Sequence, residues 1–353
     1  MDFSLMFWGD SAGGESDNGT YDHVIRISKY ADEHGYAAVW LPERHFHPWG
    51  GLHPNPAILA AALAPITRNI RLRAGSVVLP LHNPIRVAEE WAVVDNLSGG
   101  RVELAIATGW KDDDFVLAPE KYAKRKTEVW DAIRTVEALW RGEKFTGING
   151  HGKEIQVQTF PRPVQPELPV WITSSGGLRT MSDAGHTGYN LLTHLLMQSF
   201  EDVESKIAQY KAYRVRGGFR GPGKVALMAH TFLGTDRSIV KEKVRGAMSS
   251  YLRNSADLMV RAEQRGEWNA MDKTARDEMA MVAFERYFET ASLMGTPETA
   301  RATIRKLEEM GVSELCCLVD FGLPTGDILE SLTLLTEVKD WANNRAKPQL
   351  KRA

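Results

Sequence analysis

The chain has 353 residues, with 43 Lys and Arg against 45 Asp and Glu, so its formal net charge is −2 at pH 7. This balance excludes a strongly basic nucleic-acid surface as the default, and 43% hydrophobic with 25% charged residues is ordinary for a globular protein. The only cysteines, Cys316 and Cys317, are adjacent, and strand neighbours point to opposite faces, so no disulfide is expected. The first residues lack a basic region, and no run of about 18 apolar residues occurs, which predicts a cytoplasmic protein without a signal peptide or membrane helix.

Short β-rich runs alternate with helical patterns along the chain. Residues 21–34 are predicted to be helical, because Val24, Ile27 and Ala31 recur on one face. Asn83 and Pro84 form an N-cap and first-turn pair for a later helix. Strands are predicted over residues 3–8, 37–41, 70–79, 101–108, 170–173, 190–194, 225–233 and 314–321.

Eight strand-then-helix units predict a parallel sheet with right-handed crossovers, closed as a (β/α)₈ TIM barrel in a single domain over residues 1–353. The alternative is an open doubly wound sheet. Residues 145–157 carry three glycines and predict a small hairpin insertion. Residues 254–285 are charged and contain four methionines; they are either a lid before the last strand or an extra surface helix. Residues 346–353 are predicted to be a disordered tail.

In such a barrel the site lies at the C-terminal ends of the strands. Residues 174–177, Ser-Ser-Gly-Gly, follow a strand and open a helix, so their backbone N–H groups could cradle a phosphate. A plain strand-to-helix turn is the alternative, because Gly-Gly turns are common. No G-x-G-x-x-G follows the first strand and no G-x-x-x-x-G-K-[ST] occurs, which disfavours a Rossmann nicotinamide site and a P-loop.

The histidines at strand ends permit a second interpretation. His45 and His47, with His194, His230 and Asp320, resemble the ligands of a metal-dependent barrel hydrolase. The H-x-H pair follows the second predicted strand, whereas such hydrolases carry it on the first. No metal site is therefore predicted, and histidines placed in this way are proton-handling or hydrogen-bonding groups.

The chain resembles the bacterial luciferase-like flavin-dependent monooxygenases, in particular the branch associated with natural-product biosynthesis. Each matching stretch is weak alone, but together they run over nearly the whole chain in the expected order. They are residues 40–47 (WLPERHFH), 72–80 (LRAGSVVLP), 84–91 (PIRVAEEW), 97–102 (LSGGRV), 107–110 (ATGW), 169–173 (PVWIT), 190–196 (NLLTHLL) and 295–298 (GTPE).

The resemblance implies that reduced FMN binds at the mouth of the barrel. Ala74 and Gly75 should lie against the isoalloxazine ring, where the family often has a non-proline cis peptide, and Thr108 should lie beside the flavin. Thr193 and His194 should flank the ring. The residues implied to hold the phosphate are Ser174, Ser175, Gly176, Gly177 and Thr180.

His45 matches a family histidine near the reacting edge of the flavin, and the preceding residue is Arg44 where the luciferases carry a second histidine. This difference argues against light emission and places a fixed cation near the mouth, suited to an anionic substrate or tether. His45 is the candidate for setting the protonation state of the oxygenating intermediate, because histidine ordinarily titrates near neutral pH.

The implied activity is that of a two-component monooxygenase. A separate flavin reductase would supply reduced FMN, O₂ would form a C4a-(hydro)peroxyflavin, and the substrate would be a natural-product or carrier-protein-tethered intermediate. The family also implies a homodimer. Two alternatives remain: a deazaflavin-dependent hydride-transfer oxidoreductase on the same barrel, and a non-catalytic flavin-binding protein.

Overall fold

The computed structural model describes residues 1–8, 17–47, 49, 52–196, 198–259 and 271–346. All eight predicted strands are present, together with a short strand, β10, that the sequence did not predict. The nine strands are β1 (Asp2–Met6), β2 (Ala38–Leu41), β3 (Arg71–Val78), β4 (Val102–Ala107), β7 (Val170–Thr173), β8 (Asn190–His194), β9 (Val225–Leu233), β10 (Leu293–Gly295) and β11 (Glu314–Leu318).

The strand order is β10-β9-β11-β1-β2-β3-β4-β7-β8, and β8 also pairs with β9. This last pairing closes an eight-stranded barrel, with β10 added as a short parallel neighbour of β9. The predicted barrel is therefore confirmed, and the open doubly wound alternative is wrong. The chain forms two compact units: the first unit comprises residues 1–37 and 174–353, and the second unit comprises residues 38–173.

The second unit contains β2, β3, β4 and β7, with α2 (Pro56–Leu63), α3 (Pro84–Ser98) and α4 (Arg125–Arg141). Helix α3 begins as predicted, because the Asn83 side chain accepts a hydrogen bond from the backbone N–H of Ile85 and Pro84 occupies the first turn. Four 3-10 segments complete this unit: Ala64–Ile66, Leu79–Leu81, Asp113–Leu117 and Pro119–Lys124.

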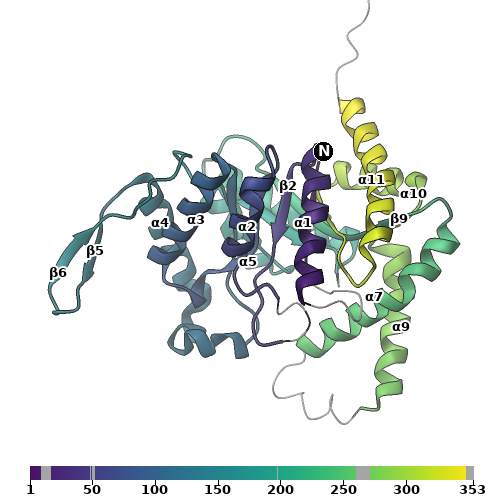
Figure 1. The fold of residues 1–353 in the computed structure, drawn as a ribbon, viewed down its shortest axis with the longest axis horizontal. Coiled ribbons are helices and arrows are strands. Elements are labelled where there is room, and N and C mark those ends of the chain that lie inside the picture. The colour runs from purple at the N-terminus through teal and green to yellow at the C-terminus, as the bar shows by residue number, and fades with distance from the viewer. Residues whose placement is uncertain (9–16, 48, 50–51, 197, 260–270, 347–353) are drawn as a thin grey trace, which may run out of the picture. The chain divides into compact units, whose positions relative to one another are not determined.

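The predicted hairpin insertion is confirmed. Strands β5 (Phe145–Ile148) and β6 (Glu154–Val157) pair antiparallel as a separate two-stranded sheet. The hairpin projects beyond α4 (Figure 1), and every residue of β6 is exposed. It therefore adds little to the core of the second unit.

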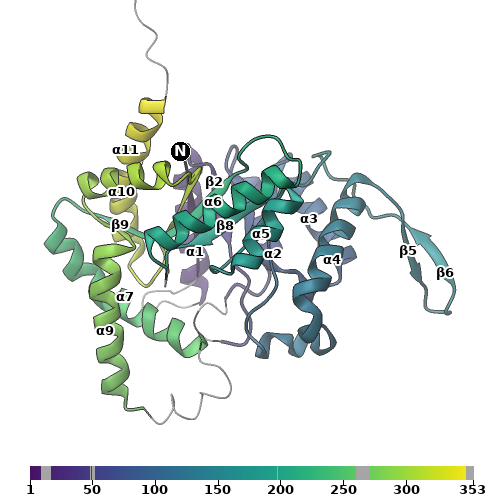
Figure 2. The same ribbon diagram turned by 180° about the vertical axis from the view of Figure 1, so that it is seen from behind.

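The first unit contains seven helices in its described residues. They are α1 (Asp17–Glu33), α5 (Leu178–Thr187), α6 (Phe200–Arg216), α7 (Arg237–Met259), α9 (Lys273–Thr290), α10 (Pro297–Glu309) and α11 (Thr325–Ala346). Helices α5 and α6 lie side by side (Figure 2). Gly185 permits this contact, because a Cβ at that position would lie 2.3 Å from the backbone oxygen of Tyr210.

The excursion over residues 254–285 consists, where described, of the end of α7 and most of α9. Residues 260–270 of the excursion and residues 347–353 of the expected tail lie outside the described residues, so lid movement and a disordered tail stay predictions. None of the described helices combines the length and the apolar character needed to cross a membrane.

A polar layer crosses the strands of the second unit. Arg73 on β3 is 2% exposed, and its Nε lies 2.8 Å from a carboxylate oxygen of Glu103 on β4. The guanidinium stacks over Trp40 and Trp171, and the Trp171 indole N–H donates to Glu103 at 2.7 Å. This buried ion pair is thus enclosed by aromatic rings. Its carboxylate also accepts the Trp171 hydrogen bond and lies 3.0 Å from the Arg71 Nε, which offsets part of the cost of burying charge.

Candidate functional site

The predicted site residues fall into two groups, one in each unit. Arg44, His45, Ala74, Gly75 and Thr108 belong to the second unit, and the other seven belong to the first unit. Those seven are Ser174, Ser175, Gly176, Gly177, Thr180, Thr193 and His194. That the two groups surround one ligand stays a prediction.

In the second unit, β3 is irregular at the predicted ring-binding position. Ala74 is fully buried, the Gly75–Ser76 peptide bond is cis, and the register with β4 shifts between Gly75 and Val77. The Ser76 hydroxyl forms a 2.5 Å hydrogen bond with that of Thr173, the last residue of β7. Thr108 directly follows β4 and is half-buried. A register shift of this kind is over-represented next to active sites.

Glu43 anchors the residues that follow β2. One of its carboxylate oxygens accepts hydrogen bonds from His45 Nε2 at 2.9 Å and His82 Nε2 at 2.7 Å. The other accepts the backbone N–H of Val78 at 2.8 Å, and the Glu43 side chain is fully buried. With its Nε2–H given to Glu43, a neutral His45 keeps the lone pair of Nδ1, which can accept a proton. From the sequence, no role was predicted for Glu43 or His82.

The same hydrogen bonds fix the charge of Glu43. Burial alone would raise its pKa, but the hydrogen bonds from His45 and His82, and the charge of His82, outweigh burial and lower the pKa. Burial lowers the pKa of His82, but the hydrogen bond and charge of Glu43 outweigh it and raise the pKa. The group is therefore built around a buried carboxylate anion.

Arg44 is 7% exposed, and its guanidinium lies 4.7 Å from the centre of the Trp49 ring. The neighbouring His53 is buried, and this burial, with the charge of Arg44, lowers its pKa to about 4. Burial raises the pKa of Asp114, and this effect outweighs the positive charges of Arg44 and His45, which lower the pKa. Arg44 thus supplies a fixed cation against an aromatic face, beside the Glu43–His45 group.

In the first unit, the turn after β7 begins with backbone pairing to β8. The Ser174 N–H donates to the Leu192 oxygen at 2.9 Å, and the Thr193 hydroxyl donates to the Ser174 oxygen at 2.9 Å. Gly177 is the N-cap of α5, and no side chain caps this helix start. The first N–H groups of α5 therefore have no side-chain acceptor at the N-cap, which is the arrangement that anions bind.

Gly176 lets two polar side chains approach this turn. It has φ +106°, and a Cβ built there would lie 2.7 Å from the Gln198 Oε1 and 3.1 Å from the Lys206 Nζ. Lys206 donates to Gln198 Oε1 at 2.7 Å, and Gln198 donates to the His194 oxygen at 2.6 Å. Lys206 was not predicted from the sequence, because its position on α6 becomes relevant only when α6 packs beside α5.

His194 and His230 are held neutral by burial. Burial, and then the charge of Lys206, lowers the pKa of His194 to about 4, and its Nδ1 is buried without a hydrogen-bond partner among the described residues. His230 is fully buried and shares a 2.8 Å hydrogen bond with the Tyr287 hydroxyl. Burial, and then the charge of His194, lowers the pKa of His230 to about 3.

The metal-hydrolase alternative finds no ligand set in the described part of the chain, where no three His, Cys, Asp or Glu side chains gather to hold a metal. Asp320 instead accepts the backbone N–H of Trp8 at 2.6 Å, a structural contact. Cys316 and Cys317 are buried thiols, and no disulfide joins them.

A comparison with protein families identifies the chain. Residues 1–314 match the model of the luciferase-like monooxygenases. The chain belongs to this family. Membership in the luciferase-like monooxygenases confirms the resemblance inferred from the sequence motifs. All of these motifs lie within the matched residues 1–314.

Two relatives illustrate the range of luciferase-like enzymes similar to this chain. The oxygenase component of a flavin-dependent trigonelline monooxygenase from Acinetobacter baylyi is 27% identical over 218 residues, covering 60% of this chain and 59% of that protein. The 4-hydroxyprotoasukamycin monooxygenase of Streptomyces nodosus subsp. asukaensis is 33% identical over 169 residues, covering 46% and 44%. The chain thus matches about half the length of these curated relatives.

Two solved structures show the luciferase-like fold over nearly the whole chain. The oxygenating constituent of 3,6-diketocamphane monooxygenase from Pseudomonas putida, in complex with FMN, has a TM-score of 0.75 at 19% identity, covering 96% of this chain and 97% of that one. An F420-dependent secondary alcohol dehydrogenase has a TM-score of 0.70 at 17% identity, with the same coverages. At these identities the likeness concerns the fold alone.

Proposed function

We propose that this protein is the oxygenase component of a two-component FMN-dependent monooxygenase. A separate flavin reductase supplies reduced FMN, and an organic substrate, of natural-product or carrier-tethered type, receives one atom of O₂. Family membership supports a flavin enzyme. The names of the trigonelline and diketocamphane relatives support an oxygenase component that works with flavin.

The observation that carries the choice of FMN is the turn at Gly176. FMN ends in a phosphate dianion, and this turn offers uncapped helix N–H groups with the Lys206 ammonium beside them. Ser174, Ser175, Gly176, Gly177 and Thr180 would hold the phosphate, as the sequence motif suggests. A Cβ at Gly176 would collide with Gln198, so the residues present fit this role.

The remaining site residues are assigned to binding the flavin ring and to proton transfer. Bound reduced FMN would supply the two electrons that activate O₂. Ala74, Gly75, Thr108, Thr193 and His194 would enclose the ring and exclude water. His45 Nδ1 would accept or return a proton, Glu43 would orient the imidazole, and Arg44 would attract an anionic substrate. A homodimer is also proposed from the family.

The decisive experiment measures cofactor and product together. Anaerobic titration should show that reduced FMN binds more tightly than reduced riboflavin, and both more tightly than a reduced deazaflavin. With a reductase and carrier-bound acyl or aminoacyl candidates under ¹⁸O₂, one product should gain one ¹⁸O. Binding of deazaflavin alone, with no oxygen uptake, would support hydride transfer, the second candidate that the F420-dependent structural neighbour favours. Flavin binding without oxygen uptake would indicate the non-catalytic alternative.

A substitution of His45 tests its assigned proton role. His45→Ala should leave FMN binding unchanged but release peroxide in place of product, since the site would lose its proton carrier. Stopped-flow spectra and a peroxide assay would report this uncoupling. Unchanged spectra and an unchanged product yield would refute the role.

A further inference from the structure

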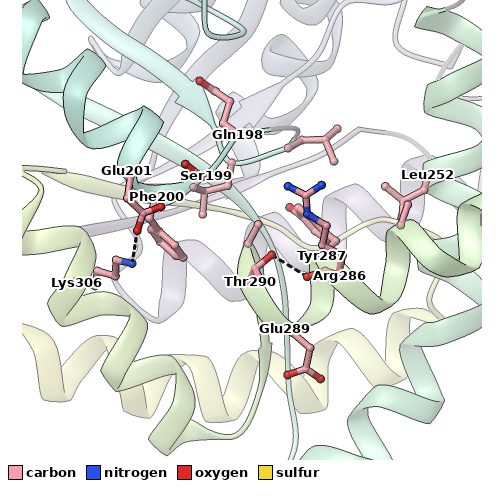
Figure 3. A pocket seen from close by; sticks show the side chains of 14 residues that line it. Gln198, Ser199, Phe200, Glu201, Leu252, Arg286, Tyr287, Glu289, Thr290 and Lys306 are labelled. Atoms are coloured by element: carbon pink, nitrogen blue, oxygen red, sulfur yellow. Dashed lines mark hydrogen bonds and ion pairs between the residues drawn. The ribbon is translucent and has the colours of Figure 1, made fainter.

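The first unit carries a pocket of about 670 Å³ that none of the predicted site residues lines (Figure 3). Its walls come from the loop after β8, the start of α6, and parts of α7, α9 and α10. This volume lies within the range of small-molecule sites, roughly 300–1,000 Å³. The pocket is therefore large enough for a small organic ligand.

One part of the lining is apolar. Leu195 and Leu196 are buried where they follow β8, and Leu252 and Phe200 extend the apolar surface. Tyr287 adds an aromatic face whose hydroxyl is already hydrogen-bonded to His230. An apolar ligand body would contact these side chains without leaving a buried polar group unsatisfied.

The charged part of the lining is unbalanced. Glu201 and Lys306 neutralise each other in a 3.4 Å ion pair, and Glu289 is paired with two cations of α7. In the close-up the Glu289 carboxylate points away from the other lining side chains, whereas the Arg286 guanidinium lies among them (Figure 3). Within the described part of the chain, Arg286 forms no ion pair. Among the described residues, Arg286 is therefore the one charged side chain of the lining that has no oppositely charged partner.

We propose that this pocket binds a small organic anion with an apolar body, of the class of medium-chain or aromatic carboxylates. The carboxylate pairs with Arg286, because a guanidinium matches a carboxylate in a two-point contact. The body packs on Leu195, Leu196 and Leu252. The proposal goes beyond the proposed flavin function, because binding here requires neither flavin nor oxygen. The pocket adjoins the turn at Gly176 through Gln198, which is among its lining residues.

The test is a calorimetric titration of the full chain without flavin. Octanoate is the probe, and octan-1-ol and octylammonium are its uncharged and cationic counterparts. Octanoate should bind saturably at one site, and octylammonium should not bind. Arg286→Gln should weaken octanoate binding at least tenfold, and Ala283→Trp should abolish it by filling the pocket. Both positions are exposed, so these variants should fold, which circular dichroism would check.

Arg220→Gln is the matched control, because it removes an exposed arginine that does not line the pocket. It should leave octanoate binding unchanged. Equal affinity for octanoate and octylammonium, octanoate affinity unaltered in Arg286→Gln, or no binding of octanoate at all would each overturn the proposal. None of these results depends on whether the protein binds FMN.

Discussion

Lys206 is the side chain that distinguishes the turn after β7 from an ordinary strand-to-helix turn. Its ammonium reaches Gln198 beside Gly176, where the predicted phosphate would lie. Lys206→Gln should therefore weaken FMN binding by about tenfold to a hundredfold, the effect of losing a charged hydrogen bond. Riboflavin binding, measured in the same fluorescence titration, should change little.

Lys29→Gln is a suitable control for this prediction, because Lys29 is an exposed lysine on α1. It should bind FMN and riboflavin like the wild type. An equal loss of FMN and riboflavin affinity in Lys206→Gln would show that Lys206 supports the fold of the site and does not contact the phosphate.

His82 gives a second prediction, through pH. Its folded-state pKa is raised by Glu43, so its stabilising effect is complete below the ordinary histidine pKa and is lost as pH rises through the raised value. Glu43 has a lowered pKa, so it contributes stability at pH values above its ordinary pKa. The loss of stability in His82→Gln should thus be about 1–3 kcal/mol near pH 6 and smaller at pH 9. Urea unfolding at the two pH values measures it, with exposed His151→Gln as the control.

The motif around residues 40–47 was sufficient to single out Arg44 and His45 as candidates from the sequence. Their partners were not predictable in the same way. His82 reaches Glu43 only because β2 and β3 pair, and Lys206 reaches Gly176 only because α5 packs on α6. Contacts between residues distant in sequence depend on strand register and helix packing, which residue patterns do not specify. Glu43 itself lay within the recognised motif and could have been chosen as the orienting carboxylate.

At the scale of elements, β3 and β4 are joined by the buried Arg73–Glu103 pair. Removing Glu103 leaves the Arg73 guanidinium buried without its carboxylate, so Glu103→Leu should lower the free energy of unfolding by about 3–5 kcal/mol. The double variant Arg73→Met with Glu103→Leu should lose less, because no buried charge is stranded: Arg71, which also pairs with Glu103, has an exposed side chain that water can solvate. Denaturant unfolding of wild type, both single variants and the double variant tests this. A double variant that loses the sum of both single losses would contradict the account.

The elements predicted from sequence were those with strong periodicity. Eight strands and the buried faces of the helices around Trp91, Trp140 and Leu335 were correct. Strand β10 was missed because three residues cannot display an alternating pattern. Helix α10 was missed although Thr296 and Pro297, an N-cap and a first-turn proline, marked its start.

At the scale of the whole molecule, the number of strand–helix units was enough to predict a closed barrel. The sequence could not predict the protonation states of the histidines, because their pKa values depend on burial in the folded structure. Burial lowers the pKa to about 4 in His23, His53 and His194 and to about 3 in His230. His53 lies in the second unit, and the other three lie in the first unit.

Acid should therefore unfold the protein through these four histidines. In the unfolded chain each binds a proton near pH 6.5, whereas the fold keeps each neutral down to its lowered pKa, so stability is complete above pH 6.5 and falls as pH falls toward that value. Each contributes roughly 1.4 kcal/mol per pH unit in this window. The urea midpoint should drop steeply between pH 7 and 5. His230→Phe keeps an aromatic ring against Tyr251 and Phe321. This variant should lose less of its urea midpoint between pH 7 and 5, by about the contribution of one of the four histidines. A midpoint that stays constant from pH 7 to 5 would show that these side chains are protonated within the fold.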